Sequence, residues 1–189
     1  MTDFRIEALA ARVPLAGKHV VELGCYHGAL TMELSALCGR VTAIEGREEN
    51  LAQAKMRAYP NDAKVEFVLA NVENINCPWV DADVYFNSGV LYHLADPITN
   101  LYDCFRHARE AVLLDTHYAA STDTTYRSFD VRTYNEPEGA KSGLGPVSFW
   151  LQKADLLYLT KRWWKKVEVV SDRVERNGPR ITIIATEKA

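Results

Sequence analysis

A carboxylate placed directly before a glycine-bracketed loop is the first feature of this chain that could do chemistry. Residues 22–28 have the sequence ELGCYHG. Glycine is needed where a ligand approaches the backbone or where φ turns positive, and a helix leaves its first amides without internal partners. A phosphate would suit such amides, but Glu22 would repel it. We therefore expect this loop to bind a ligand that carries positive groups.

A second acid stands at the end of an apolar run. Glu45 closes the run 40–45 and follows the glycines by about twenty residues. At that separation in an α/β sheet, the carboxylate can accept hydrogen bonds from ribose hydroxyls. The two acids together indicate a nucleoside-binding site at one edge of a sheet.

Alternating apolar runs and amphipathic stretches supply the elements that must position these acids. Strands are expected at 19–21, 40–45, 65–69, 81–86 and 111–115, and helices at 4–13, 29–37, 48–58 and 98–109. Asp96 and Pro97 are favourable residues for the start of the last of these helices. Strands that alternate with helices predict an α/β fold with a doubly wound parallel sheet, in which all strands end at one edge.

The C-terminal part predicts one more helix and a hairpin. We expect Ser148 to cap a helix through residues 149–159. Residues 165–171 and 180–186 alternate as two strands joined through a turn at 177–179. An antiparallel pair at this place argues against a dinucleotide-binding domain, which normally ends with another parallel strand.

Two segments carry a resemblance to a known family. ELGCYHG resembles the first motif of class I S-adenosylmethionine-dependent methyltransferases, although Tyr26 stands where a middle glycine is common. The run GVLYHLADP at 89–97 is similar to the segment after strand four in many small members, including those that modify the tRNA wobble uridine. The resemblance implies a Rossmann-like seven-stranded sheet, mostly parallel with a C-terminal antiparallel hairpin, and S-adenosyl-L-methionine as the cofactor.

The resemblance also implies a set of cofactor-binding residues. In the family, the acid after strand two binds the ribose, and a polar residue after strand three meets the adenine amino group. Asn71 stands at the second position, and Val72 offers a backbone amide. The expected cofactor-binding residues are Glu22, Gly24, Cys25, Tyr26, Gly28, Glu45, Gly46, Asn71, Val72, Asn87 and Ser88.

Methyl transfer to a hydroxyl requires a group that removes a proton, and such a base must lie near the ends of strands four or five. The candidates are His117, His93 and Asp115, with His117 favoured because histidine titrates near neutrality. Each can equally be a hydrogen-bonded residue at a strand end. The expected activity is methyl transfer to an oxygen or nitrogen of a small-molecule acceptor.

Three other functions compete with this interpretation. A tRNA-modifying enzyme of the wobble-uridine type is the main alternative, since KRWWKK at 161–166 combines basic and aromatic side chains. A non-catalytic scaffold is disfavoured because the cofactor residues are retained. A nicotinamide oxidoreductase is disfavoured by Glu22 and by the missing third glycine. The closing hairpin agrees with the methyltransferase interpretation.

Composition sets broad limits on the protein. With 189 residues and 48% hydrophobic content, the chain suits one domain over 1–189 with a sizeable core. Residues 118–147 are polar and turn-rich, so we interpret them as a substrate-facing insertion or lid. A formal net charge of -3 offers no global field for nucleic acid, which makes RNA a weaker candidate partner.

Other site classes receive no support from the sequence. Cys25, Cys38, Cys77 and Cys104 lack the paired spacing of a disulfide framework or a zinc site, and no histidine and carboxylate cluster predicts a metal. The N-terminus is unlike a secretory signal and no membrane-spanning run is present, so a cytoplasmic protein is expected. The sequence does not indicate an oligomeric state.

Overall fold

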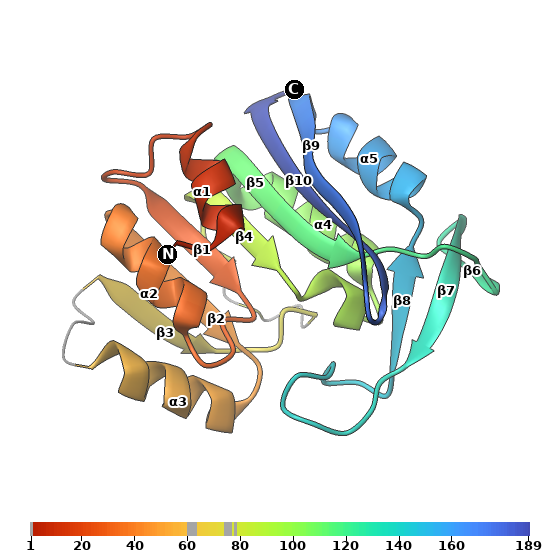
Figure 1. Cartoon of the computed structure of the whole chain (residues 1–189), viewed down its shortest axis with the longest axis horizontal. Coiled ribbons are helices and arrows are strands. Elements are labelled where there is room, and N and C mark those ends of the chain that lie inside the picture. The colour runs from red at the N-terminus through yellow and green to blue at the C-terminus, as the bar shows by residue number, and fades with distance from the viewer. Residues whose placement is uncertain (1, 60–63, 74–76, 78) are drawn as a thin grey trace.

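A seven-stranded sheet in the order β3-β2-β1-β4-β5-β10-β9 forms the centre of the molecule (Figure 1). The computed structural model describes residues 2–59, 64–73, 77 and 79–189. The strands are β1 (His19–Leu23), β2 (Arg40–Glu45), β3 (Val65–Leu69), β4 (Ala82–Ser88), β5 (Ala108–His117), β9 (Trp164–Glu175) and β10 (Gly178–Lys188). β1 to β5 are parallel, and β10 is antiparallel to both β5 and β9. The predicted fold class is therefore confirmed.

Helices cover both faces of this sheet. They are α1 (Phe4–Ala10), α2 (Ala29–Leu37), α3 (Glu48–Ala58), α4 (Pro97–His107) and α5 (Lys153–Lys161), with a 3₁₀ turn η1 (Leu91–His93). α4 begins with the cap residues named from the sequence, because the Asp96 side chain accepts a hydrogen bond from the Thr99 amide and Pro97 takes the first helical position. Buried residues of α1, α2 and α3 pack on one face and those of α4 and α5 on the other, giving three layers.

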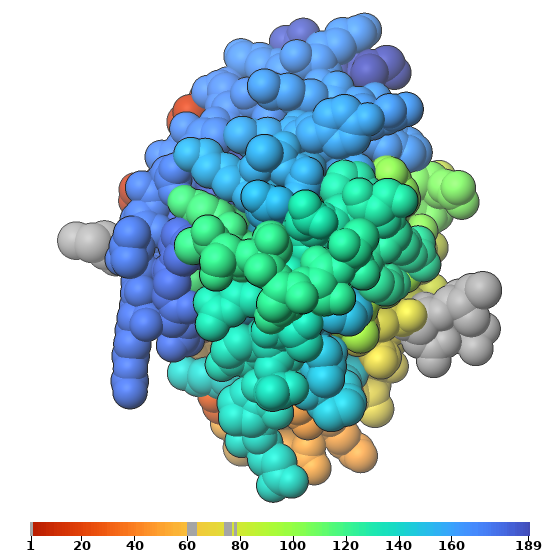
Figure 2. All heavy atoms as spheres, turned by 90° about the vertical axis from the view of Figure 1, so that its right-hand side faces the viewer, coloured from red at the N-terminus to blue at the C-terminus, as the bar shows by residue number. Residues whose placement is uncertain are grey.

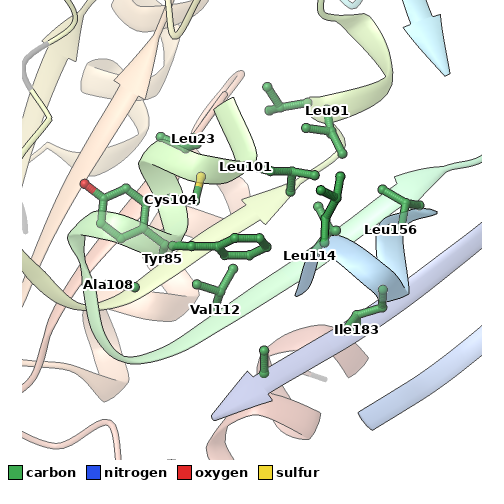
Figure 3. Close-up of a cluster of buried hydrophobic side chains, with 14 of the residues drawn as sticks. Leu23, Tyr85, Leu91, Leu101, Cys104, Ala108, Val112, Leu114, Leu156 and Ile183 are labelled. Carbon is green, nitrogen blue, oxygen red and sulfur yellow. The ribbon is translucent and has the colours of Figure 1, made fainter. Parts of the chain in front are cut away.

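The core is apolar on both faces of the sheet. Strand alternation sends Val20 to the cluster beneath α1 to α3 and Val21 to the cluster beneath α4 and α5. In the second cluster, Leu101 of α4 and Leu156 of α5 both point toward the sheet (Figure 3). Each fully buried side chain of this size contributes about 1.5–3 kcal/mol, so this packing holds the strand ends in place.

A second, three-stranded sheet begins within the segment 118–147, which was expected to be an insertion or lid, and ends after it. Its strands are β6 (Thr124–Tyr126), β7 (Phe129–Asn135) and β8 (Val147–Leu151), in the order β6-β7-β8. The segment that contains these strands covers much of one face of the molecule (Figure 2). The predicted helix from Ser148 is wrong, because Ser148 and Trp150 pair with β7 and are buried. The helix starts later, after Gln152.

Several predicted boundaries also differ from the structure. α1 ends at Ala10 rather than Val13, although Val13 is still buried in the core. α4 covers 97–107 rather than 98–109, since Ala108 already belongs to β5. The closing strands are longer than predicted, and the turn between them lies at Arg176 and Asn177. None of the described helices is long and apolar enough to cross a membrane.

Removal of a core side chain tests this packing. Leu101 is fully buried in α4, and Leu101→Ala should lower the free energy of unfolding by about 2–5 kcal/mol because it leaves a cavity. Met56→Ala in α3 is a matched control, since Met56 is 77% exposed and helix propensity changes little. Urea denaturation followed by circular dichroism measures both. Equal stability of the two variants would contradict the assignment of Leu101 to the core.

Candidate active site

A cavity of about 300 Å³ opens at the carboxyl ends of β1 to β4. The strand order reverses between β1 and β4, and ligands of doubly wound sheets bind at that point. The wall includes the glycine loop, the residues after β2, β3 and β4, and a loop between β7 and β8. Of the predicted cofactor residues, those on the wall are Glu22, Gly24, Cys25, Tyr26, Glu45, Gly46, Asn71, Val72 and Ser88.

The glycine loop has a conformation that explains its sequence. Gly24 and Gly28 have φ of 65° and 75°, and a Cβ at Gly24 would lie 2.3 Å from the Val90 side chain. Tyr26, which replaces the common middle glycine, also has a positive φ of 52°. Its backbone amide donates a hydrogen bond to Glu45 Oε2 at 2.9 Å. The loop therefore keeps a left-handed turn at Tyr26 although that residue carries a side chain.

The two predicted acids differ in environment. Glu22 is buried and accepts a hydrogen bond from the Thr31 hydroxyl at 2.5 Å. Burial raises the pKa of Glu22 to about 7, an effect that Thr31 only partly opposes. Glu45 instead accepts hydrogen bonds from the amides of Tyr26 and Arg47 and from the Asn50 side chain. Both carboxylates are thus held in fixed positions at adjacent strand ends.

The polar residues after β3 and β4 lie in different places. Asn71 lines the cavity, and its side-chain oxygen accepts a hydrogen bond from the Glu73 amide at 2.9 Å. Ser88 also lines the cavity. Asn87, by contrast, is fully buried and donates to Asn100 of α4 at 2.9 Å. Asn87 and Gly28 are not among the described residues that line the cavity, so the structure does not bring these two predicted residues to its wall.

His117, the favoured base, lies apart from the cavity wall. Its side chain is buried, its Nδ1 is 3.1 Å from the carbonyl oxygen of Pro179, and its ring stacks on Trp150. Burial lowers the pKa of His117. These contacts are those of a histidine packed at the end of β5.

Asp115 is also outside the wall, inside a cluster of arginines. It is fully buried and bonded to Arg5, Arg173, Arg180 and Thr182. Burial alone would raise its pKa, but the bonds and charge of Arg180 and the other donors lower the pKa of Asp115 to about 2. A carboxylate with so low a pKa is a weak base, so this residue is suited to holding arginines.

His93 is the candidate base that the structure places on the cavity wall. It lies in η1 directly after β4, and its Nδ1 is 2.9 Å from Glu136 Oε2. Sequence reasoning missed Glu136, which follows β7 in the segment without periodicity. It also missed Arg47 and Asn50, which hold the loop between β7 and β8 against the cavity.

A family model described as a methyltransferase domain matches residues 21–114. The crystal structure of the N-terminal domain of EvdMO1 in the presence of SAH and D-fucose superposes with a TM-score of 0.85 and 26% sequence identity, covering 99% of this chain and 84% of that one. The chain belongs to the class I S-adenosylmethionine-dependent methyltransferases. This family uses S-adenosylmethionine as its cofactor, and the matched region contains both predicted motifs.

Curated members of the family are similar over part of their length. The ubiquinone biosynthesis O-methyltransferase of Xanthomonas oryzae pv. oryzae is 27% identical over 107 residues, which are 56% of this chain and 45% of that protein. The protein of the same name from Methylocella silvestris is 28% identical over 130 residues, or 67% of this chain and 50% of its own. This methyltransferase chain spans about half the length of the curated relatives it matches.

The Asp115 network makes a prediction about stability in acid. Because the pKa of Asp115 is lowered to about 2, its charge stabilises the fold above about pH 4, and that contribution is lost as pH falls through about 2. Between pH 5 and pH 2 the wild type should therefore lose about 2 kcal/mol more unfolding free energy than Asp115→Asn. Chemical denaturation at each pH measures this difference.

The matched control for this experiment is Glu168→Gln. Glu168 pairs with Arg12 on the surface, where solvent screens the pair, so its removal should change the pH dependence much less. Parallel stability curves for the wild type and Asp115→Asn would contradict the assigned role of the arginine cluster.

Proposed function

We propose that this chain binds S-adenosylmethionine in the cavity and transfers its methyl group to an oxygen of a small-molecule acceptor. The observation that carries the proposal is the convergence of Glu22, Glu45 and Asn71 from three adjacent strand ends on one glycine loop. Carboxylates suit a cofactor with an ammonium and a sulfonium group. The O-methyltransferase relatives support oxygen as the acceptor atom.

The residues of the cavity fit the parts of this cofactor. Glu45 is the proposed ribose ligand, because backbone amides already orient both of its oxygens. Asn71 and Val72 would meet the adenine, and Glu22 would face the positive groups. S-adenosylmethionine supplies a methyl carbon already joined to a good leaving group, so the protein chiefly contributes alignment, desolvation and removal of a proton.

We propose His93 as the group that takes this proton. During transfer a bond forms between the acceptor oxygen and the methyl carbon, the bond from that carbon to sulfur breaks, and the hydroxyl proton passes to the imidazole. His93 lines the cavity, whereas His117 and Asp115 are held by other contacts. An imidazole is suited to this role near neutral pH.

The proposed acceptor is a hydroxylated ring compound. Tyr92 lines the cavity, and its ring packs edge-on against the buried Trp150 with 5.9 Å between the ring centroids. Aromatic faces pack well against sugar or phenol rings. The neighbour crystallised in the presence of D-fucose and the relatives named for ubiquinone biosynthesis both agree with this class.

The tRNA alternative draws less support from the structure. Trp164 is buried at the start of β9, and Trp163 packs near Phe105 and Tyr102. These side chains are therefore engaged in the core and offer little aromatic surface for stacking on bases.

We further propose that the loop at 139–146 is the lid of a single domain over 1–189. Arg47 donates hydrogen bonds to the carbonyl oxygens of Ser142 and Gly143 at 3.2 and 2.8 Å, and Asn50 donates to that of Ala140 at 2.9 Å. Lys141 lies 5.5 Å from the centre of the Tyr26 ring. The loop thus borders the proposed cofactor site, although the insertion was expected to face the substrate.

Calorimetric titration with S-adenosylmethionine tests the cofactor site. Glu45→Ala should weaken binding at least about tenfold, because it removes a charge-assisted hydrogen-bond acceptor for the ribose. Glu49→Ala is the control, since Glu49 is exposed on α3 and should leave the affinity unchanged. Absence of saturable binding to the wild type would overturn the proposed function.

The raised pKa of Glu22 predicts a pH-dependent affinity. A positive ligand favours the ionised carboxylate, whereas the free protein keeps Glu22 protonated below about pH 7. Affinity for S-adenosylmethionine should therefore fall about tenfold per pH unit below pH 7, with one proton released on binding. Glu22→Gln should flatten this dependence. Titrations in buffers of different ionisation enthalpy count the protons, and a pH-independent wild type would contradict the role.

The proposed base is tested by transfer of a labelled methyl group to D-fucose and to 3,4-dihydroxybenzoate as acceptor probes. His93→Ala should lower kcat about 10²–10⁴-fold while leaving cofactor affinity nearly unchanged. His117→Ala is the comparison and should retain more activity. A larger loss of kcat in His117→Ala would reverse the assignment of the base, and no transfer by the wild type to either probe would contradict the acceptor class.

A further inference from the structure

Glu136 is a buried carboxylate that touches the proposed base from another part of the chain. Its side chain is 1% exposed, and its Oε2 lies 2.9 Å from His93 Nδ1. The residue follows β7, so it reaches the site from the small sheet rather than from the central sheet. We propose that Glu136 is a positioning residue that turns His93 into the proton acceptor of this site.

The charge state of Glu136 decides which nitrogen of His93 carries hydrogen. Burial would raise the pKa of Glu136, but hydrogen bonds from His93, Ser148 and the Gly143 amide outweigh it and hold the pKa below its usual value. An ionised carboxylate only accepts hydrogen bonds, so Nδ1 of His93 must be the donor. The neutral ring then carries its lone pair on Nε2, the nitrogen required for removing a proton.

Other contacts keep the Glu136 carboxylate in place. Its Oε1 accepts a hydrogen bond from the Ser148 hydroxyl at 2.6 Å, and its Oε2 also accepts one from the Gly143 amide at 2.8 Å. The 139–146 loop also lies close against the backbone of His93, because a Cβ at Gly143 would be 2.5 Å from the His93 carbonyl oxygen. The partner of the base is therefore fixed by both β8 and the proposed lid.

The position of Nε2 agrees with this role. His93 lines the cavity and its side chain is 20% exposed. Among the residues that the structure describes, no hydrogen-bond partner contacts Nε2. The Tyr92 ring lies 4.1 Å from the imidazole between centroids and limits its rotation. Within the described part of the chain, Nε2 is thus the ring nitrogen left without a hydrogen bond, on a side chain that lines the cavity.

Nitrogen NMR of protein labelled with ¹⁵N-histidine tests the inference without any acceptor. At pH 8.5, where histidine is normally neutral, the His93 signals, assigned by their loss in His93→Gln, should show hydrogen on Nδ1. Glu136→Ala should shift the proton largely to Nε2. Glu136→Gln should retain the Nδ1–H form, since its amide oxygen still accepts the bond.

Two results would overturn the inference. One is a wild type in which Nε2 of His93 carries the proton, and the other is a Glu136→Ala variant that keeps the wild-type spectrum. Assignment of the histidine signals must come from folded protein, so circular dichroism is measured on each variant. If Glu136→Ala fails to fold, the tautomer of His93 in the wild type tests the inference by itself: hydrogen on Nδ1 supports it and hydrogen on Nε2 overturns it.

The inference rests on the proposed function, and calorimetry keeps their failures distinct. Glu136 is not among the described residues that line the cavity, and the amide oxygen of Glu136→Gln can still accept the hydrogen bond from Gly143, so Glu136→Gln should bind S-adenosylmethionine within about threefold of the wild type. Absence of cofactor binding by the wild type would overturn the proposed function whatever the tautomer. Loss of affinity in Glu136→Gln, which retains an acceptor oxygen for Gly143, would instead assign the Glu136 carboxylate to the cofactor site and overturn its role as partner of the base.

Discussion

The carboxyl edge of the central sheet depends on one buried carboxylate. Asp115 is fully buried at the end of β5, where Arg5 of α1, Arg173 of β9 and Arg180 of β10 all donate to it. A buried charge is costly unless it is paired and hydrogen-bonded, so the fold is favourable only with α1 and the closing hairpin seated on this edge. Ser88, which donates to the same carboxylate, also lines the cavity. The network therefore fixes one wall of the site.

Glycines allow close contacts with the backbone in the glycine loop and in the 139–146 loop. Gly24 leaves room for Val90 after β4, and Gly28 leaves room for Ala54 of α3, where a Cβ would be 3.0 Å away. Gly143 allows the 139–146 loop to reach the backbone of His93 in the same way. At Gly24 and Gly143 a Cβ would lie within 2.5 Å of a neighbouring atom, so a side chain there would force that neighbour to move, whereas the contact at Gly28 is tight. Charge and close packing together define the cavity.

The sequence predicted the first five strands and the helices between them, because local periodicity and end signals determine those elements. For residues 147–151, local periodicity and end signals do not determine the secondary structure. Such a short apolar run is compatible with a strand or with part of a helix, and its pairing partner β7 lies more than ten residues earlier. Trp150 pairs with Arg132 of β7, is buried and stacks on His117 of β5. The strand β8 could not be predicted from local signals, because its pairing with β7 joins residues at least 12 positions apart.

The site likewise contains residues that sheet topology brings together and residues joined by contacts distant in sequence. Glu22, Glu45 and Asn71 could be expected to converge, since parallel strands bring their carboxyl ends to one edge. The contact between His93 and Glu136 joins residues 43 positions apart, and Glu136 lies in a segment without periodicity. No local signal could reveal it. In this fold, the residues proposed to bind the cofactor follow from sheet topology, whereas those proposed to act on the acceptor depend on an insertion whose own fold must be known first.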